Sequence, residues 1–241
     1  MTTPISPDTT PVLLKPATIT LVGTSHVSKQ SAHDAQAAIA TADLVAIELD
    51  HGRAQGLLSG KRATFGELRK HLGFRTALLA TTLRWLQERI ASSLDVTPGL
   101  EMKAALETAA KANKPVALID REITVTMHRL RAAFGAREFL QMCKDAFRRR
   151  KIPVHPSDDF VVQILGEMKQ HYPRLYRAMV AERDEHMANA LVRLAERYRG
   201  QHIVVIVGKG HVPGMLEQIR YLNAELTVTV WSSAVTNTKQ S

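Results

Sequence analysis

The sequence lacks several patterns that mark particular protein classes. Its 241 residues include a single cysteine, Cys143, so no internal disulfide framework is expected. No stretch approaches about 18 continuous apolar residues, the length that a membrane-spanning helix needs. Residues 1–15 are polar and proline-rich, without the charged and then apolar order of a signal peptide. We therefore expect a cytoplasmic protein with no membrane span and with a disordered tail over residues 1–15.

Aromatic residues are scarce as well, at 5% of the chain, and no recognised nucleic-acid-binding motif occurs. The charge is nevertheless positive, because 32 Lys and Arg face 23 Asp and Glu, a net charge of +9. Such an excess favours anionic partners. The densest basic run, residues 148–151, is more typical of a solvated helix end whose charge complements the helix dipole. We predict no nucleic-acid partner.

Two matching segments lie near opposite ends of the chain. Each is an apolar, β-branched run, at residues 17–22 and 203–207, that leads into a Gly-x-x-His motif ending in His26 or His211. In open α/β sheets, ligands bind beyond the carboxyl ends of the strands. If both strands belong to one parallel sheet, the two histidines are expected to meet at a single site.

Charged residues follow two further predicted strands. The strand near residues 44–48 ends in Glu48, and the strand at 115–119 is followed by Asp120 and Arg121. A carboxylate at the end of a buried strand must be paired or liganded, because isolated burial of its charge is very costly. We therefore expect these side chains to belong to the same site as the histidines.

The strand patterns alternate with helical ones, which predicts an α/β fold with a central, mainly parallel β-sheet flanked by helices. The last strand is expected near residues 226–231. We predict one domain over residues 16–232, with large helical insertions at about 57–94 and 123–200 and a polar tail over 233–241.

The helical middle contains two features that the structure can test. One helix is expected to start with Thr97 as its N-cap and Pro98 in its first turn. The other feature is a dense charge cluster at residues 181–187, which includes Glu182 and Arg183. From the residues alone, a solvated helix face is the favoured interpretation of this cluster, ahead of a wall of the site.

Six blocks occur in an order that resembles the TraB/PrgY family, and together they run from about residue 19 to 231. They are Gly-Thr-Ser-His-Val-Ser at 23–28, Val-Ala-Ile-Glu-Leu-Asp at 45–50, Pro-Gly-Leu-Glu-Met-Lys-Ala-Ala at 98–105, Leu-Ile-Asp-Arg-Glu-Ile at 118–123, Glu-Arg-Asp-Glu-His-Met at 182–187 and Gly-Lys-Gly-His-Val-Pro-Gly at 208–214. The family includes the pheromone-shutdown protein PrgY and is related to the TIKI proteases and to GumN, ChaN and erythromycin-esterase-like folds.

The resemblance implies a central sheet flanked by helices. It also implies a metal-dependent, peptidase-type site built from the two Gly-x-x-His motifs with acidic and arginine residues nearby. In this light the helix that carries Glu182 and Arg183 is better explained as a wall of the site than as a solvated surface.

Two neutral imidazoles and a carboxylate suit a divalent Zn, Mn, Co or Fe ion that keeps open positions, as metal-assisted hydrolysis requires. We predict His26, Glu48 and His211 as the metal ligands. A second carboxylate, Asp120 or Glu182, is the expected general base.

Three arginines, Arg53, Arg121 and Arg183, are suited to hold a substrate carboxylate or to stabilise an oxyanion. The predicted function is a metal-dependent hydrolase acting on a peptide or a related amide or ester. The alternative is a protein that sequesters a peptide or metal in the same cleft without turnover. A weaker alternative is an anion-binding regulatory module, although the loop at 208–210 lacks the full phosphate-binding pattern. Exposed apolar faces of the helical middle also suggest a homodimer contact.

Overall fold

The computed structural model describes residues 15–24, 29–60, 64–74, 77, 81, 99–133 and 158–231. The first half of the chain contains β1 (Thr18–Thr24), α1 (Lys29–Thr41), β2 (Leu44–Ile47), α2 (His51–Ser59), α3 (Phe65–Leu72), α5 (Leu100–Lys111), β3 (Val116–Leu118) and α6 (Ile123–Ala133). The second half contains α8 (Asp158–His171), α9 (Pro173–Tyr176), the π-helical η1 (Arg177–Ala181), α10 (Glu182–Arg197), β4 (His202–Gly208), the 3-10 turn η2 (Lys209–His211), α11 (Val212–Leu222) and β5 (Val228–Val230).

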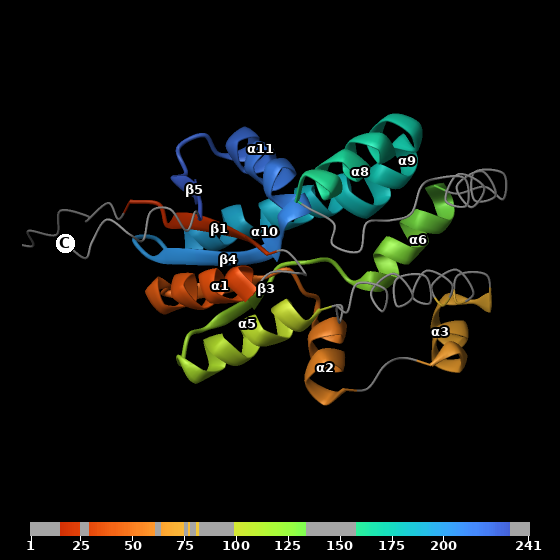
Figure 1. Cartoon of the computed structure of the whole chain (residues 1–241), viewed down its shortest axis with the longest axis horizontal. Coiled ribbons are helices and arrows are strands. Elements are labelled where there is room, and N and C mark those ends of the chain that lie inside the picture. Colours follow the sequence, from red (N-terminus) through yellow and green to blue (C-terminus); the bar gives the residue numbers. More distant parts are fainter. Residues whose placement is uncertain are drawn as a thin grey trace, which may run out of the picture.

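The strands form one parallel sheet in the order β3-β2-β4-β1-β5, which confirms the predicted α/β class (Figure 1). Every predicted strand range coincides with an observed strand. The two strands that carry the Gly-x-x-His motifs are neighbours, and their pairing ends with Thr24 beside Gly208. The loops that follow them therefore leave from the same edge of the sheet.

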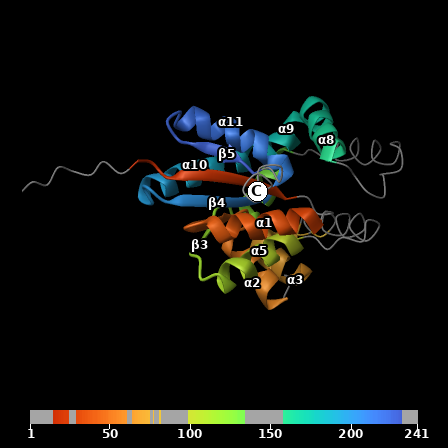
Figure 2. The same ribbon diagram turned by 60° about the vertical axis from the view of Figure 1, so that its left-hand side comes forward.

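Each face of the sheet is covered by a different pair of helices (Figures 1 and 2). On one face, Leu21 and Val205 pack in a core with residues of α10 and α11. On the other, Val22 and Ile206 pack in a core with residues of α1 and α5. Because β1 and β4 are buried on both sides, their sequences are continuous apolar runs, as expected for strands inside a parallel sheet.

The start of α5 differs from the prediction. The helix begins at Leu100, and its N-cap is Gly99, whose φ of 84° lies in the left-handed region that favours glycine. The expected start in the turn formed by Thr97 and Pro98 was therefore too early, and these two residues lie outside the described part of the chain. Glycine turns the backbone into the helix here, so no side-chain cap is needed.

Several helices gather beyond the carboxyl edge of the sheet (Figure 1). Helix α6 packs against η1, and α8 packs against η2, the turn that follows β4.

Large parts of the two predicted insertions fall outside the described residues, so the division into one domain, insertions and tails stays a prediction. Within the described ranges, no helix combines the length and apolarity that crossing a membrane requires.

Candidate functional site

The glycine of each Gly-x-x-His motif lets a neighbouring side chain or loop approach the strand end. A Cβ atom at Gly23 would lie 2.9 Å from Cγ of Lys209, and one at Gly208 would lie 3.3 Å from Oε2 of Glu48. The backbone N–H of Gly208 donates a 2.7 Å hydrogen bond to that same Glu48 oxygen. The second motif thus holds the carboxylate of Glu48 at the carboxyl edge of the sheet.

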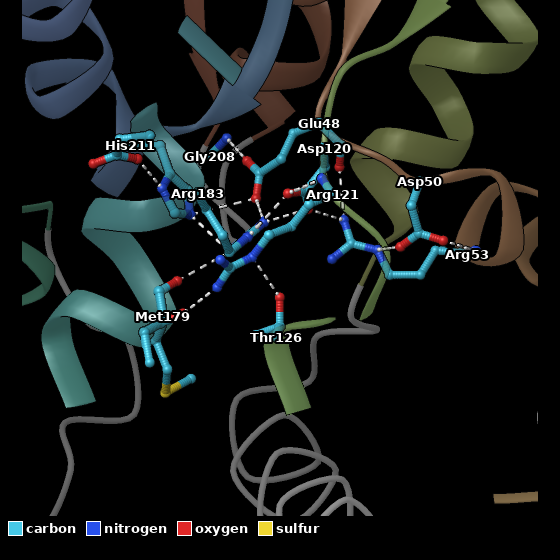
Figure 3. Close-up of polar contacts among 12 residues, drawn as sticks. Glu48, Asp50, Arg53, Asp120, Arg121, Thr126, Met179, Arg183, Gly208 and His211 are labelled. Carbon is cyan, nitrogen blue, oxygen red and sulfur yellow. Dashed lines mark hydrogen bonds and ion pairs between the residues drawn. The ribbon is translucent and has the colours of Figure 1, made fainter. Parts of the chain in front are cut away.

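Arg183, from the first turn of α10, lies at the centre of a charged network (Figure 3). Its Nε and Nη2 atoms donate to the two oxygens of Asp120, over 3.2 and 2.7 Å, and Nη2 also donates to Oε1 of Glu48. The side chain of Arg183 is only 14% exposed. Two buried carboxylates therefore share one buried guanidinium, which compensates charges that would be costly alone.

His211 lies next to this guanidinium (Figure 3), and its other ring nitrogen contacts Asp184. Its Nδ1 atom lies 2.5 Å from Oδ1 of Asp184, and its Nε2 atom lies 3.0 Å from Nη1 of Arg183. A guanidinium only donates hydrogen bonds, so Nε2 is the acceptor and the proton sits on Nδ1, which donates to Asp184. The carboxylate therefore fixes the imidazole in the tautomer that points a lone pair into the site.

Arg53 closes the network on the side of α2. Its guanidinium lies 3.2 Å from Oδ2 of Asp120 and donates a 2.8 Å hydrogen bond to the backbone oxygen of Glu48. Asp50 is the N-cap of α2, accepts a 2.9 Å hydrogen bond from the backbone N–H of Arg53 and pairs with its guanidinium at 3.3 Å. The cap thereby fixes the helix turn from which Arg53 reaches the site.

Arg121 connects the strand β3 edge to the helices. It donates to Oγ1 of Thr126 over 3.0 Å, to Oε2 of Glu182 over 2.9 Å and to the backbone oxygen of Ala178 over 2.5 Å. Ala178 lies within the π-helical segment η1. Arg121 therefore ties α6, η1 and α10 to the end of β3.

The surroundings of three groups shift their pKa values. Burial alone would raise the pKa of Asp120, but the hydrogen bond and charge of Arg183, with the charge of Arg53, outweigh it and lower that pKa. Burial opposes the charged form of Arg183 too, yet Asp120 and Glu48 raise its pKa. For Asp184, burial dominates and raises the pKa despite the hydrogen bond with His211.

The structure brings together the predicted site residues that it describes. They are Glu48, Arg53, Asp120, Arg121, Glu182, Arg183 and His211. The remaining one, His26, lies outside the described residues, although the strand that leads to it ends beside Gly208. Their roles in catalysis or binding stay predictions.

The interpretation of residues 181–187 as a solvated face was wrong for its centre. Arg183 is largely buried and Asp184 is 2% exposed, whereas Glu185 and His186 are exposed. Sequence reasoning also missed Asp184 as the partner of His211. The structure shows what permits this contact: Gly214, in the same block as His211, has no side chain, and a Cβ there would lie 2.1 Å from Oδ2 of Asp184.

The positions of the nitrogen and oxygen donors can be compared with the coordination geometry that a divalent ion requires. Nε2 of His211 lies 3.4 Å from Oε1 of Glu48. Two ligands of a tetrahedral zinc ion, each roughly 2.0–2.2 Å from the metal, lie roughly 3.3–3.6 Å apart. Among the described residues no group of three metal-binding side chains occurs. The spacing and donor types of this pair fit a metal, and His26 as a third ligand stays a prediction.

An open pocket of about 720 Å³ adjoins the network. Asp120 and Arg121 line it and also take part in the network, so the two are continuous. The other lining residues come mainly from α6, η1 and α10: Glu122, Val125, Arg129, Arg177, Glu182, Glu185, His186, Asn189 and Arg193. A ligand in this pocket would contact three of the residues that the sequence singled out, Asp120, Arg121 and Glu182.

Comparison with known families explains this arrangement of motifs. The family model described as the TraB/PrgY/gumN family matches residues 13–229. The chain belongs to this family. It is 29% identical to an uncharacterized protein of Methanocaldococcus jannaschii, over 85% of this chain and 54% of the relative. It is also 27% and 26% identical to TraB domain-containing proteins of Mus musculus and Homo sapiens, over 81% of this chain and 61% of each relative. This TraB-family chain thus spans less than two thirds of these relatives.

Proposed function

We propose that this TraB-family chain is a metal-dependent hydrolase acting on a peptide or a related amide or ester. The observation that carries the proposal is the pair formed by His211 and Glu48. The imidazole is oriented by buried Asp184, and its Nε2 atom lies 3.4 Å from Oε1 of Glu48. Both lie beyond the carboxyl ends of parallel strands, where α/β proteins place their ligands.

In this proposal Glu48, His211 and His26 hold a Zn, Mn, Co or Fe ion. When bound, the ion supplies a Lewis acid that polarises the scissile carbonyl group. Nη1 of Arg183 already contacts Nε2 of His211, and Nη2 contacts Oε1 of Glu48. The guanidinium therefore has to shift away from these two atoms for the ion to bind. Asp184 keeps the proton of His211 on Nδ1 and so leaves Nε2 available.

Glu182 is the proposed general base. Its side chain is 20% exposed and lines the pocket, whereas that of Asp120 is 1% exposed and has its pKa lowered by Arg183 and Arg53. A carboxyl group with a lowered pKa accepts protons poorly near neutral pH. We assign Asp120 to hold Arg183 and Arg53 in place, and we assign those two arginines with Arg121 to the developing oxyanion.

The test uses two histidines from the same segment of chain. Protein purified without chelators or added metal is analysed for bound metal, and a broad peptide library is then digested with it. His211→Ala should abolish most metal binding and turnover, while His202→Ala, at the other end of β4, should leave both near the parental level. His26→Ala should match His211→Ala, and the double variant should lose little more, since ligands of one ion act as a unit.

A second pair of variants separates turnover from binding. Glu48→Gln should remove hydrolysis while circular dichroism shows an intact fold, and Glu217→Gln, an exposed glutamate of α11, is the matched control. If both histidine variants bind metal as the parent does, the metallohydrolase proposal is wrong.

Sequestration of a peptide without turnover is the second candidate function. One observation favours it: Arg183 already pairs with both Glu48 and Asp120, so the two carboxylates are partly compensated without a metal ion. The same digest decides between the two, because a sequestering protein would bind peptides and leave them uncut. A pheromone-like peptide would be a ligand of this kind. The cytoplasmic location and the homodimer stay predictions.

A further inference from the structure

Three arginines from different elements surround the carboxylate of Glu182. Arg121 contacts Oε2 at 2.9 Å, Arg129 of α6 lies 3.7 Å from the same oxygen, and Arg177 of η1 lies 3.7 Å from Oε1. One carboxylate is thus flanked by three guanidiniums, a local excess of two positive charges. Arg121 alone is close enough to satisfy it with a strong, charge-assisted hydrogen bond.

The outer two arginines are held loosely. Their side chains are 64% and 78% exposed for Arg129 and Arg177, and each approaches Glu182 through Nε only, at a distance beyond that of a hydrogen bond. Exposed ion pairs of this length contribute little to stability. Within the described part of the chain, neither guanidinium has another hydrogen bond or ion pair, so their terminal nitrogens are available to a ligand in the pocket.

The pocket lining as a whole contains equal numbers of acidic and basic side chains: Asp120, Glu122, Glu182 and Glu185 against Arg121, Arg129, Arg177 and Arg193. Asp120 is engaged by Arg183 and Arg53, and neither of these arginines lines the pocket. Glu122 accepts a hydrogen bond from Thr124, and among the described residues neither Glu122 nor Glu185 forms an ion pair with Arg129 or Arg177. Three of the four lining arginines are therefore concentrated around Glu182, the proposed general base.

We propose that Arg129 and Arg177 form a subsite that binds a carboxylate of the peptide substrate. The planar fork of a guanidinium matches a carboxylate, and two forks from separate helices fix its position. The bound carboxylate anchors the peptide so that its backbone runs along Glu182 toward Asp120, where the pocket and the network meet. The inference rests on the proposed function, and it names acidic peptides as the substrate class.

The test measures binding instead of turnover. Fluorescein-labelled random peptides with one fixed glutamate are compared with the same peptides carrying glutamine, each with a free or an amidated carboxyl end. Binding is followed by fluorescence anisotropy. The parent should prefer a carboxylate by about tenfold or more, as expected for hydrogen bonds to charged groups. Arg129→Gln/Arg177→Gln should lose that preference.

The matched control is Arg131→Gln/Arg174→Gln, which removes the same charge from α6 and α9 at exposed positions outside the pocket lining. It should keep the parental preference. Preference for the free carboxyl end identifies a terminal carboxylate, and preference for glutamate identifies a side chain. If the pocket double variant keeps the parental preference, or the parent binds acidic and amide peptides equally, the subsite proposal is overturned.

These outcomes separate the subsite from the hydrolase proposal. A chain that binds acidic peptides through Arg129 and Arg177 but never cuts them retains the subsite and loses the hydrolase. A chain that is inactivated by Glu48→Gln but binds all peptides alike retains the hydrolase and loses the subsite.

Discussion

Two histidines at opposite ends of β4 show how differently one strand can use the same residue. His202, at its start, donates from Nδ1 to the backbone oxygen of Thr41 over 3.1 Å and accepts from Oγ1 of Thr20 over 2.8 Å. His211, just past its end, has three charged side chains as its polar partners among the described residues: Asp184, Arg183 and Glu48. The first histidine links neutral groups of neighbouring elements, and the second belongs to a charge network.

The difference follows from the direction of the strands. At the start of β4 the partners of the imidazole are a backbone oxygen and a hydroxyl group, which a neutral ring can bond with its two nitrogens, and the nearby carboxylate of Asp43 accepts from the backbone N–H of His202. At the carboxyl edge, three strand ends and two helix starts among the described residues deliver ionisable side chains to one place. Buried charge there must be balanced locally, so each residue constrains the others. This difference between the two ends of the sheet can be tested by substitution.

The largest effect is expected from Arg183→Met. Removing the guanidinium leaves Glu48 and Asp120 buried near each other with less compensation, and breaking such a pair costs about 3–5 kcal/mol. Equilibrium unfolding in urea measures the loss. Arg174→Met, at an exposed position on α9, should change the free energy of unfolding by less than about 0.5 kcal/mol. If the two substitutions changed the free energy of unfolding equally, Arg183 would not stabilise the fold through this network.

Gly214→Ala is expected to come next, with a loss of about 1–3 kcal/mol. The new Cβ would lie 2.1 Å from Oδ2 of Asp184, so the carboxylate behind His211 must move. Gly166→Ala is the control, because a Cβ there meets nothing within 4 Å in the helix α8. That change should stabilise the protein by about 0.5–1 kcal/mol. In an Asp184→Ala background, Gly214→Ala should cost much less.

The pH dependence of stability should separate Asp120 from Asp184. The pKa of Asp120 is lowered in the folded state, so its contribution is present above the unfolded pKa of about 3.9 and is lost as pH falls through the lower folded value. The pKa of Asp184 is raised, so its contribution declines as pH rises from about 3.9 through the folded value.

Urea unfolding at a series of pH values tests both signs. The stability difference between the parent and Asp120→Asn should be largest above about pH 4 and should shrink on acidification. The corresponding curve for Asp184→Asn should have the opposite slope. A common slope would contradict the assigned surroundings of one of the two carboxylates.

The smallest effect is expected at the other end of the strand. His202→Gln should cost about 1 kcal/mol or less, because it weakens neutral hydrogen bonds at a half-buried position. Metal content and peptide binding should stay at the parental level. If His202→Gln lowered metal content as far as His211→Gln, the division of roles between the two ends of β4 would be wrong.

The sheet and the meeting of its strand ends could be predicted because both depend on local pattern and simple geometry. Apolar β-branched runs marked the strands, and parallel pairing brings the residues after them to one edge. For that reason Glu48, Asp120 and His211 were identified from sequence and do lie together.

The partners within the site could not be predicted in the same way. Charged residues at 182–184 look like any exposed helix until the fold shows that two of them face inward. Which carboxylate supports His211 depends on how α10 packs against α11, a contact between elements that no local pattern encodes. His26 was predicted as a metal ligand. This role stays a prediction because His26 lies outside the described residues.

The π-helical segment η1 sets the rotation of the helix that follows it. Glu182, Arg183 and Asp184 are adjacent in sequence, yet each has a different partner: Arg121, Asp120 and His211. A π turn holds more residues than an α turn, and each residue of an α-helix rotates the chain by about 100°. Deleting one residue within 177–181 would leave the helix nearly the same length but would present each partner with the wrong side chain. The number of residues in η1 thus determines which side chain at the start of α10 meets which partner in the charged network.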